Sequence, residues 1–553
     1  MVLPPGTGAP PPDDPTLTFQ RVQPRWPLPP PPANQFPPPQ VQPRSDAARA
    51  VGGFALLAVP VVALVLAYVL PTVRTVEFSR LQGFLSGDLA DAGGANYDRV
   101  LAEGELWDGV LRLIGPTGLL VLGGAVIAPF LALLVHQAGP AVRAVSRVAW
   151  VLAAITFTPA ALTVAWLVER VVSERESEAS LYDWPLLISG VVIGTGFLVS
   201  LAALRGGDGK RAGTLATTAS LTAIALAAAG LQTFAYGLIS GLPEDARLPV
   251  HQIYDGVRAG MDVGYAGAVS VLLLGVLAVL GLGAAVLFAA ARLRIDVDPA
   301  PAEPSKTRAG AAVLAFAVLV LALAAVGYFL LPWITRAGEV SEPAQDLWFT
   351  IRRTWGPPLV TTGVALTAAA AGGFAIGALR PLGDRSRWLL LLFAPWLFTG
   401  TGPLAAAHLE AVAGEGEWVV IGSFPPRAWI AVPLLFLFTA LCWGLEDRRR
   451  ALVAEGAARG AANGRFLAAA LPFALLAALA LLLVHVQDLV WNQLTYQDMF
   501  SAGVMVYALE NLDFEHTGLT YGFPLPILIP YALTAVALAI WYLPRLAVRT
   551  GRD

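Results

Sequence analysis

About a dozen long apolar runs, separated by polar stretches, constrain this chain more than any other feature. A transmembrane helix needs about 20 mostly apolar residues. Runs of that length lie near residues 51–73, 110–137, 144–169, 184–204, 214–240, 264–291, 309–335, 357–379, 388–409, 427–445, 466–487 and 523–544. The chain is 56% hydrophobic and only 14% charged, whereas soluble domains carry roughly 25% charged residues. The sequence therefore predicts an all-α, polytopic membrane protein with about twelve transmembrane helices.

A polar stretch at 295–308 divides the apolar runs into two sets of about six. We predict a first half at 51–294, a cytoplasmic linker at 295–308, a second half at 309–545 and a cytoplasmic tail at 546–553. Residues 1–50 are Pro-rich, and such segments favour polyproline II over a packed core. They are predicted to form either a solvated tail or a docking tail for an aromatic groove. The first apolar run begins too late for a cleaved signal peptide.

Lysine and arginine are enriched in the cytoplasmic loops of membrane proteins. If the N-terminus is cytoplasmic, the inner loops hold 20 Lys and Arg residues and the outer loops hold 12. We therefore expect both termini to be cytoplasmic. The outer loops are rich in Trp, which either stacks on sugars or lies at the membrane interface.

Several kinds of chemistry are absent from the sequence. The string at 207–211 lacks the leading Gly and the Ser or Thr of a phosphate-binding loop. The five His residues show no metal-ligand spacing, and the single Cys442 excludes a disulfide framework. We therefore expect no ATPase site, no metal and no cofactor in this chain, and no nucleic-acid partner.

One pair of ionisable residues stands out near the end of an apolar run. His485 and Asp488 are three residues apart and share one helical face. Buried ionisable groups in a membrane indicate a transport pathway or a proton relay. A solvated pair at the membrane interface is the other interpretation.

The segment 94–113, GANYDRVLAEGELWDGVLRL, carries the first of three motifs. It resembles the stretch before the second helix in membrane subunits of maltose-type and glycerol-phosphate-type ABC sugar importers. Asn96, Tyr97, Leu101 and Trp107 occupy the signature positions of that stretch.

A second motif lies in residues 236–274, which end the first half. That family has a turn, then Ile-Tyr, then a final helix that opens with Gly-Tyr-Ala. The matching residues are Gly241-Leu242-Pro243, Ile253-Tyr254 and Gly264-Tyr265-Ala266-Gly267-Ala268.

A third motif lies in the second half. Phe466, Leu471 and Pro472, followed by Trp491 and Asn492, resemble a pattern of the partner subunit in the same importers. The chain thus resembles both subunits, fused head to tail.

This resemblance implies a type I ABC importer permease-like fold with a central cavity, in the inner membrane of a bacterial cell. It implies ATP-binding subunits on the cytoplasmic side, with ATP-Mg bound there, and an extracytoplasmic solute-binding lipoprotein. The chain itself would be a transport subunit for a carbohydrate or a related polar solute, embedded in the lipid bilayer, and not an enzyme.

Permeases of this family receive the ATPase stroke through a short cytoplasmic helix with an E-A-A-x-x-x-G-A pattern. Residues 448–465 contain an altered copy, so the resemblance implies coupling through Glu455, Arg459, Gly460 and Ala461. At the matching place in the first half, 202–221 has no room for such a helix.

Two other functions remain open from the sequence. A permease-derived structural or regulatory membrane subunit would explain the missing first coupling helix. A membrane glycosyl-transfer enzyme would need an outer carboxylate, for which Asp88, Asp91 and Asp98 are available.

Overall fold

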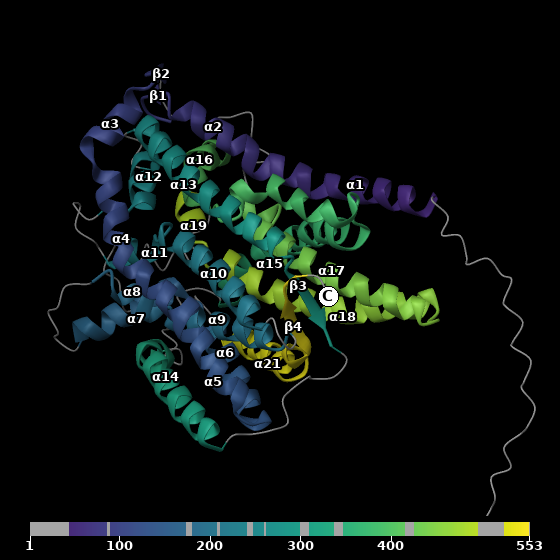
Figure 1. Cartoon of the computed structure of the whole chain (residues 1–553). Coiled ribbons are helices and arrows are strands. Elements are labelled where there is room, and N and C mark those ends of the chain that lie inside the picture. The colour runs from purple at the N-terminus through teal and green to yellow at the C-terminus, as the bar shows by residue number, and fades with distance from the viewer. Residues whose placement is uncertain are drawn as a thin grey trace, which may run out of the picture. The chain divides into compact units, whose positions relative to one another are not determined.

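The computed structural model describes residues 44–85, 89–172, 180–206, 211–240, 247–258, 262–298, 309–336, 347–414, 425–495 and 525–551. The described residues are mostly helical (Figure 1). The Pro-rich stretch 1–43 and the predicted linker residues 299–308 lie outside them.

Within the described ranges, nine helices are long and apolar enough to cross a membrane. They are Ala47–Phe78, Glu105–Gln137, Arg211–Ser240, Val263–Ala290, Ala312–Thr335, Trp355–Leu379, Pro426–Ala454, Arg459–Val486 and Ile527–Arg545. Each corresponds to one of the predicted apolar runs. The chain is therefore a polytopic, mostly helical membrane protein.

The elements of the first half follow one another along the chain. They are α1 Arg44–Leu64, η1 Val65–Val69, α2 Leu70–Phe78, β1 Leu81–Gln82, β2 Ala90–Asp91, α3 Ala95–Glu103, α4 Glu105–Val121, η2 Leu122–Ile127, α5 Ala128–Gln137, α6 Pro140–Ile155, α7 Pro159–Val172, α8 Asp183–Leu187, α9 Ser189–Leu204, α10 Arg211–Gly230, α11 Ala235–Ser240, α12 Pro249–Arg258, α13 Val263–Ala290 and β3 Arg294–Val297.

The second half continues in the same way. Its elements are α14 Ala309–Arg336, α15 Leu347–Phe374, η4 Ala375–Leu379, η5 Gly383–Leu392, η6 Ala394–Trp396, η7 Gly402–Leu404, α16 Ala405–Ala413, η8 Pro426–Ala428, α17 Val432–Ala454, α18 Arg459–Val486, α19 Leu489–Thr495, α21 Leu525–Trp541, η10 Leu543–Arg545 and β4 Leu546–Arg549. Of the η elements, η1, η2 and η4 are π-helical and the others are 3₁₀.

Among the described residues three predicted spans do not form long helices, so nine of the roughly twelve predicted transmembrane helices are confirmed. The run 144–169 splits into α6 and α7, and 184–204 yields the short α8 and the 16-residue α9. The run 388–409 consists of 3₁₀ turns followed by the short α16. Proline and glycine interrupt the helical hydrogen bonds in these runs, although their composition is apolar.

The two halves repeat one pattern of helix neighbours. In the first half, α9 packs against α5 and α10, and α10 packs against α4. In the second half, α17 packs against α15 and α18, and α18 packs against α15. The last long helices also match, because α13 contacts η6 of the second half and α21 contacts α6 of the first. The halves are therefore structural repeats that exchange contacts.

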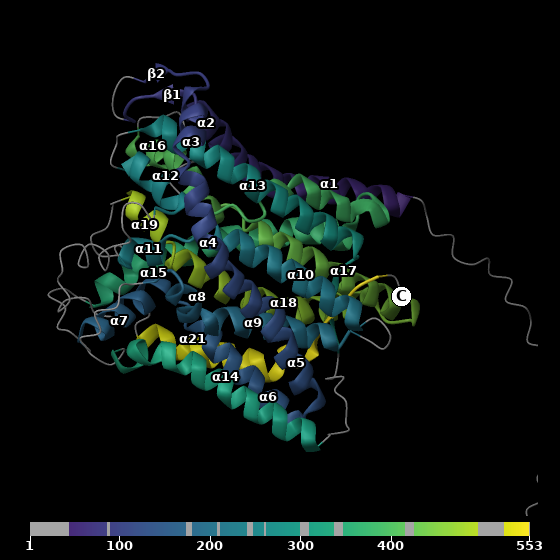
Figure 2. The same ribbon diagram turned by 60° about the vertical axis from the view of Figure 1, so that its left-hand side comes forward.

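The first helix of each half packs against the other half. A Cβ atom at Gly372 on α15 would lie 2.9 Å from Pro60 Cγ on α1, and one at Gly53 on α1 would lie 3.1 Å from Pro381. In turn, α14 packs against α5, α6 and α7. Figures 1 and 2 show α2 and α14 on opposite flanks of the bundle.

The predicted linker and tail are not simple loops, because parts of both form strands. Arg294–Val297 (β3) pairs antiparallel with Leu546–Arg549 (β4), with Ile295 opposite Val548. Strand β3 packs against α17 and β4 packs against α9, so each strand crosses to the other half. An antiparallel pair at this place is what a two-fold relation between the halves produces. The strands therefore join the halves at one end of the bundle.

Helix α17 lies at the centre of the packing. In its span 78% of the most apolar stretch is buried, compared with 22–50% in the other eight spans. Glycines on α15 and η4 allow these elements to lie close to α17. A Cβ atom at Gly377 would lie 2.5 Å from Thr439 O. On the matching helix α9, a Cβ atom at Gly194 would lie 2.8 Å from Trp150 O.

Candidate functional site

The third apolar segment of each half is broken in its middle. The first-half break, Thr156–Thr158, separates α6 from α7, and the second-half break, Leu397–Thr401, separates η6 from η7. Their surroundings match, because α7 contacts α11 and α14 while α16 contacts α19 and α2. Interrupted helices at corresponding positions of two repeats are the strongest pointer to a binding site in transporter folds.

Both breaks have the sequence Thr-x-Thr followed closely by Pro. In the first half, Thr156 Oγ1 donates a 2.6 Å hydrogen bond to Ala153 O at the end of α6. Leu162 N–H then donates to Thr158 O at 2.9 Å, which starts α7 after Pro159. Proline fits the first turn of a helix, where its missing N–H is no loss. The break is therefore encoded locally.

The second-half break is more irregular and is buried. Thr399 and Thr401 are 4% and 3% exposed. Gly400 cannot be replaced without a clash, since a Cβ atom there would lie 2.8 Å from Gln232 Oε1 and 3.0 Å from Arg427 Nη2. Non-helical backbone at membrane depth occurs only where protein or a water-filled cavity surrounds it. This backbone is surrounded by protein.

Gln232 of the first half satisfies the backbone of the second-half break. Its Nε2 donates to Phe398 O at 2.8 Å and to Ala228 O at 3.0 Å, and its Oε1 accepts from Gly400 N–H at 2.7 Å. Buried backbone groups without such partners are costly. One side chain thus fixes the break and joins the halves.

Asp488 adds a carboxylate to the same region. Its Oδ2 accepts a 2.6 Å hydrogen bond from Thr401 Oγ1, and its Oδ1 accepts from Trp491 N–H at 3.3 Å in the first turn of α19. His485, which the sequence paired with it, instead contacts Thr361 and Thr362 through Nδ1, at 3.2 and 3.1 Å. The two ionisable groups therefore have separate hydrogen-bond partners, and the proton relay stays a prediction.

The structure brings four signature residues together at the opposite end from the β3–β4 strands. Asn96 Nδ2 donates to Leu81 O at 2.7 Å, and Tyr97 lies 2.7 Å from Ser79 Oγ through its hydroxyl. A Cβ atom at Gly264 would overlap Leu81 O and the Asn96 amide. Asn96, Tyr97, Gly264 and Tyr265 thus form one unit, the signature cluster.

Charged groups surround the signature cluster. The guanidinium of Arg99 lies 4.6 Å from the Tyr265 ring centroid and pairs with Asp262, and its Nε lies 2.9 Å from Glu103. Partial burial opposes the charge of Arg99, but the hydrogen bonds that it donates to Asp262 and Glu103, together with their charges, outweigh burial and raise the pKa of Arg99. Asp262 also caps α13 by accepting Tyr265 N–H at 3.0 Å.

A second charged contact crosses between the halves nearby. Arg74 on α2 makes a bidentate contact with Glu410 on α16, at 2.8 and 2.5 Å. Glu410 is buried, and the Arg74 guanidinium also lies 4.5 Å from the Phe78 ring centroid. Helix α16, which follows the second-half break, is therefore bound to the first half near its C-terminal end.

The predicted coupling region folds differently from the expected short helix. Helix α17 continues to Ala454, and α18 begins at Arg459, so a four-residue turn joins two long helices. Gly456, with φ +97°, ends α17, and Ala457 N–H donates back to Leu452 O at 2.9 Å. This is a Schellman-type helix end. Glycine here terminates a helix and does not weaken one.

The four predicted coupling residues all lie on the surface of this turn. Glu455 is the C-cap of α17, and Arg459, Gly460 and Ala461 form the first turn of α18. All four are exposed. In the first half, α9 ends at Leu204 and α10 begins at Arg211, as the sequence predicted for a connection without a coupling helix.

The remaining predicted residues lie apart from one another. Pro472 is inside α18, and the Trp491 ring lies edge-on to His408, with centroids 5.8 Å apart. Asn492 N–H donates to Asp488 O at 3.1 Å. Of the carboxylates considered for glycosyl transfer, Asp91 and Asp98 are exposed, whereas Asp88 is outside the described residues, as are Gly241–Pro243.

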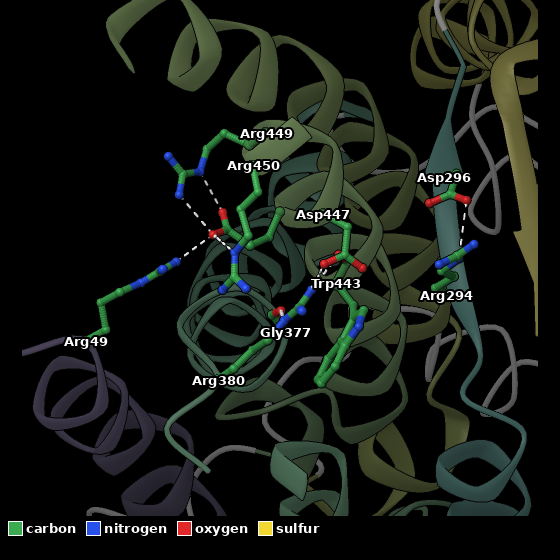
Figure 3. Close-up of polar contacts among 10 residues, drawn as sticks. Arg49, Arg294, Asp296, Gly377, Arg380, Trp443, Asp447, Arg449 and Arg450 are labelled. Carbon is green, nitrogen blue, oxygen red and sulfur yellow. Dashed lines mark hydrogen bonds and ion pairs between the residues drawn. The ribbon is translucent and has the colours of Figure 1, made fainter. Parts of the chain in front are cut away.

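Arginines gather at the end of the bundle that carries the β3–β4 strands. Glu446 is 3% exposed, and its carboxylate binds Arg49 at 2.5 Å, Arg449 at 2.6 Å and Arg450 at 2.8 Å (Figure 3). Arg448 donates to Val297 O of β3. These arginines belong to the loops predicted to be cytoplasmic, so their grouping agrees with that assignment of loops to one side.

Sequence reasoning missed Gln232 and both breaks. The available signal was the Thr-x-Thr and Pro pattern, which occurs at 156–159 and again at 399–403. The apolar composition of both segments concealed it. Neither a protein-family model nor a curated protein matches this sequence.

Proposed function

We propose that the chain is the permease component of an importer for a carbohydrate or related polar solute. The observation that carries this proposal is the pair of broken segments at corresponding positions of two repeated halves. We infer that the backbone carbonyls, the threonine hydroxyls and the Asp488 carboxylate, which are buried and bonded to protein groups in this structure, bind the hydroxyl groups of a solute when the halves move apart. A polar solute needs such groups because the lipid offers none.

In this proposal the halves rock against each other so that the region of the breaks opens to one side at a time. Gln232 and the Arg74–Glu410 pair cross between the halves and move with the solute region. The outer loops receive the solute from an extracytoplasmic binding lipoprotein.

A separate ATP-binding subunit, with ATP-Mg bound to it, drives the movement from the cytoplasmic side. The exposed α17–α18 turn, with Glu455 and Arg459, is the proposed contact. Since α17 is the most buried span, a push on this turn acts directly on the centre of the bundle.

The test combines uptake and copurification. Thr401→Val removes the hydroxyl that binds Asp488 but keeps the side-chain shape, and we expect solute uptake to fall at least tenfold. Thr367→Val, an exposed threonine on α15, is the matched control. In parallel, Glu455→Ala combined with Gly460→Leu should release the ATP-binding subunit from the purified complex. Unchanged uptake in Thr401→Val would contradict the solute site.

One observation favours a second function, that of a permease-derived structural or regulatory subunit. Neither the 455–458 turn nor the described part of the α9–α10 connection contains a helix lying across the bundle end. For this function, deletion of the gene leaves solute uptake unchanged, and the purified chain retains a partner that lacks an ATP-binding site. Loss of uptake on deletion would exclude it.

A further inference from the structure

Arg387 is a cation on the buried side of η5. A 3₁₀ helix has three residues per turn, so Arg387, Leu390 and Phe393 share one face. Leu390 and Phe393 are 1% and 0% exposed, and Arg387 is 8% exposed. Burying a charge is unfavourable unless a counter-charge and hydrogen bonds compensate it. An inward-facing arginine at this position therefore calls for a partner.

The surroundings of Arg387 supply an aromatic face, and the charges of Asp447 and Asp384 act on it without an ion pair. Its guanidinium carbon lies 3.8 Å from the Trp443 ring centroid. Among the described residues, Arg387 makes no ion pair and no hydrogen bond. Its guanidinium nitrogens keep some exposure to solvent.

Arg380 lies at the same place, and its guanidinium has both an ion-pair partner and hydrogen-bond acceptors. Its guanidinium lies 3.9 Å from the same Trp443 ring (Figure 3). It also binds Asp447 at 2.6 Å and the carbonyl oxygens of Gly377 and Trp443 at 2.9 Å. Of the two carboxylates whose charges act on Arg387, Asp447 is thus already paired with Arg380.

The local charge balance is positive. Burial, followed by the charges of Arg380 and Arg292, lowers the pKa of Arg387 to about 10. Arg387 still carries its proton at neutral pH. Asp447 and Asp384 oppose these charges, but three arginines face two aspartates and Arg387 has no ion pair, so the excess positive charge favours an anion.

The same segment exposes apolar side chains, beside the exposed Asp384 and Arg385. Leu382, Trp388 and Leu392 are 47%, 45% and 51% exposed. Tryptophan is enriched where a membrane protein meets the lipid headgroups. Basic sites between transmembrane helices bind anionic lipid headgroups. A cation beside an apolar surface matches a ligand that is anionic at one end and apolar along its length.

We propose that Arg387, on the face of Trp443, binds the phosphate of an anionic glycerophospholipid, whose acyl chains lie along Leu382, Trp388 and Leu392. A guanidinium binds phosphate oxygens bidentately. Free phosphate carries the same chemistry, but it makes no use of the apolar surface. The site is separate from the two breaks, and it does not depend on the transport proposal.

The test uses the full chain, stripped of lipid in a neutral detergent. Phosphatidylglycerol should raise its melting temperature by several degrees, whereas phosphatidylcholine and inorganic phosphate should not. Arg387→Gln should lose at least half of the shift given by phosphatidylglycerol. Arg385→Gln, which removes an exposed arginine two residues away, should behave as the wild type.

Three outcomes would overturn the proposal. An equal shift with inorganic phosphate would assign the site to a soluble anion. An undiminished shift in Arg387→Gln would place the lipid elsewhere, and an equal loss in Arg385→Gln would indicate general charge attraction. If Arg387→Gln does not fold, hydrogen exchange of the wild type decides. Residues 383–392 should be protected in phosphatidylglycerol nanodiscs relative to phosphatidylcholine, and no difference would refute the site.

Discussion

The third apolar segments of the two halves occupy equivalent places and are broken at equivalent points, yet they fold differently. The first-half segment keeps two α-helices, α6 and α7, on either side of a three-residue break. The second-half segment is 3₁₀ from Gly383 to Leu392 and becomes α-helical only at Ala405.

The two breaks differ in which residues form hydrogen bonds with their backbone groups. Threonines within the first-half break supply its local hydrogen bonds, as Thr156 does with Ala153 O. The second-half break depends on Gln232, from the other half, and Asp488, from another helix. One break is encoded locally and the other by tertiary contacts.

Gln232→Leu should have the largest effect. It removes the contact from the other half that distinguishes the second-half break from the first-half break. It leaves Phe398 O and Gly400 N–H buried without partners, at about 1–3 kcal/mol each. We expect a loss of about 4 kcal/mol in the free energy of unfolding and no measurable uptake. Chemical denaturation measures the first, with Gln137→Leu, an exposed glutamine on α5, as control. Equal losses in both variants would mean that Gln232 does not hold the break.

Acidification should destabilise the packing of α12 against the elements that follow the second-half break. Burial lowers the pKa of His251 on α12 to about 4 from its usual 6.5, and α12 packs against η7 and α16. Between these values the unfolded chain binds more protons, so stability falls as pH falls from about 6.5 to 4.

The expected loss is about 3 kcal/mol, since one pKa unit is worth 1.36 kcal/mol. Melting temperatures measured from pH 7.5 to 4 check it. His251→Leu should flatten this part of the profile. A variant that remains as acid-sensitive as the wild type would assign the effect to other groups.

Arg74→Gln tests whether the first half stabilises α16, the helix at the end of the second-half segment. It leaves the Glu410 carboxylate buried without its cation, and we expect a loss of about 2 kcal/mol, moderated because Arg74 is partly exposed. Glu77→Gln is the control, since its ion pair with Arg74 is largely exposed and contributes less than about 1 kcal/mol. Similar losses in thermal unfolding for the two variants would argue against a role for Glu410.

Two glycine substitutions in the α17–α18 turn should have small effects of opposite sign. Gly456→Ala forces a side chain into a left-handed conformation and should cost about 1 kcal/mol. Gly460→Ala lies in a helix with open space around it and should stabilise by roughly 0.5 kcal/mol. If both variants stabilise the protein in thermal unfolding, residues 455–460 form a continuous helix.

Apolar length predicted most of the spans, because a run of 20 apolar residues has few other stable forms in a membrane. It failed at 388–409, where Pro395, Gly400, Gly402 and Pro403 outweigh composition. The signature cluster was predicted as separate strings, and Asn96 and Gly264 do meet. Gln232 could not be predicted as a contact of Phe398, since sequence carries no distance information between residues 166 positions apart.

The antiparallel β3–β4 pair has a consequence for synthesis. Asp296 and Arg549, whose side chains pair across it at 2.8 Å, are 253 residues apart. At 5–20 residues per second, a ribosome needs about 10–50 s to make that interval. During this time β3 waits at the membrane surface without its partner while the second half is inserted. Assembly of the halves is therefore timed by translation, and slow codons between residues 298 and 546 would lengthen the period in which the first half stands alone.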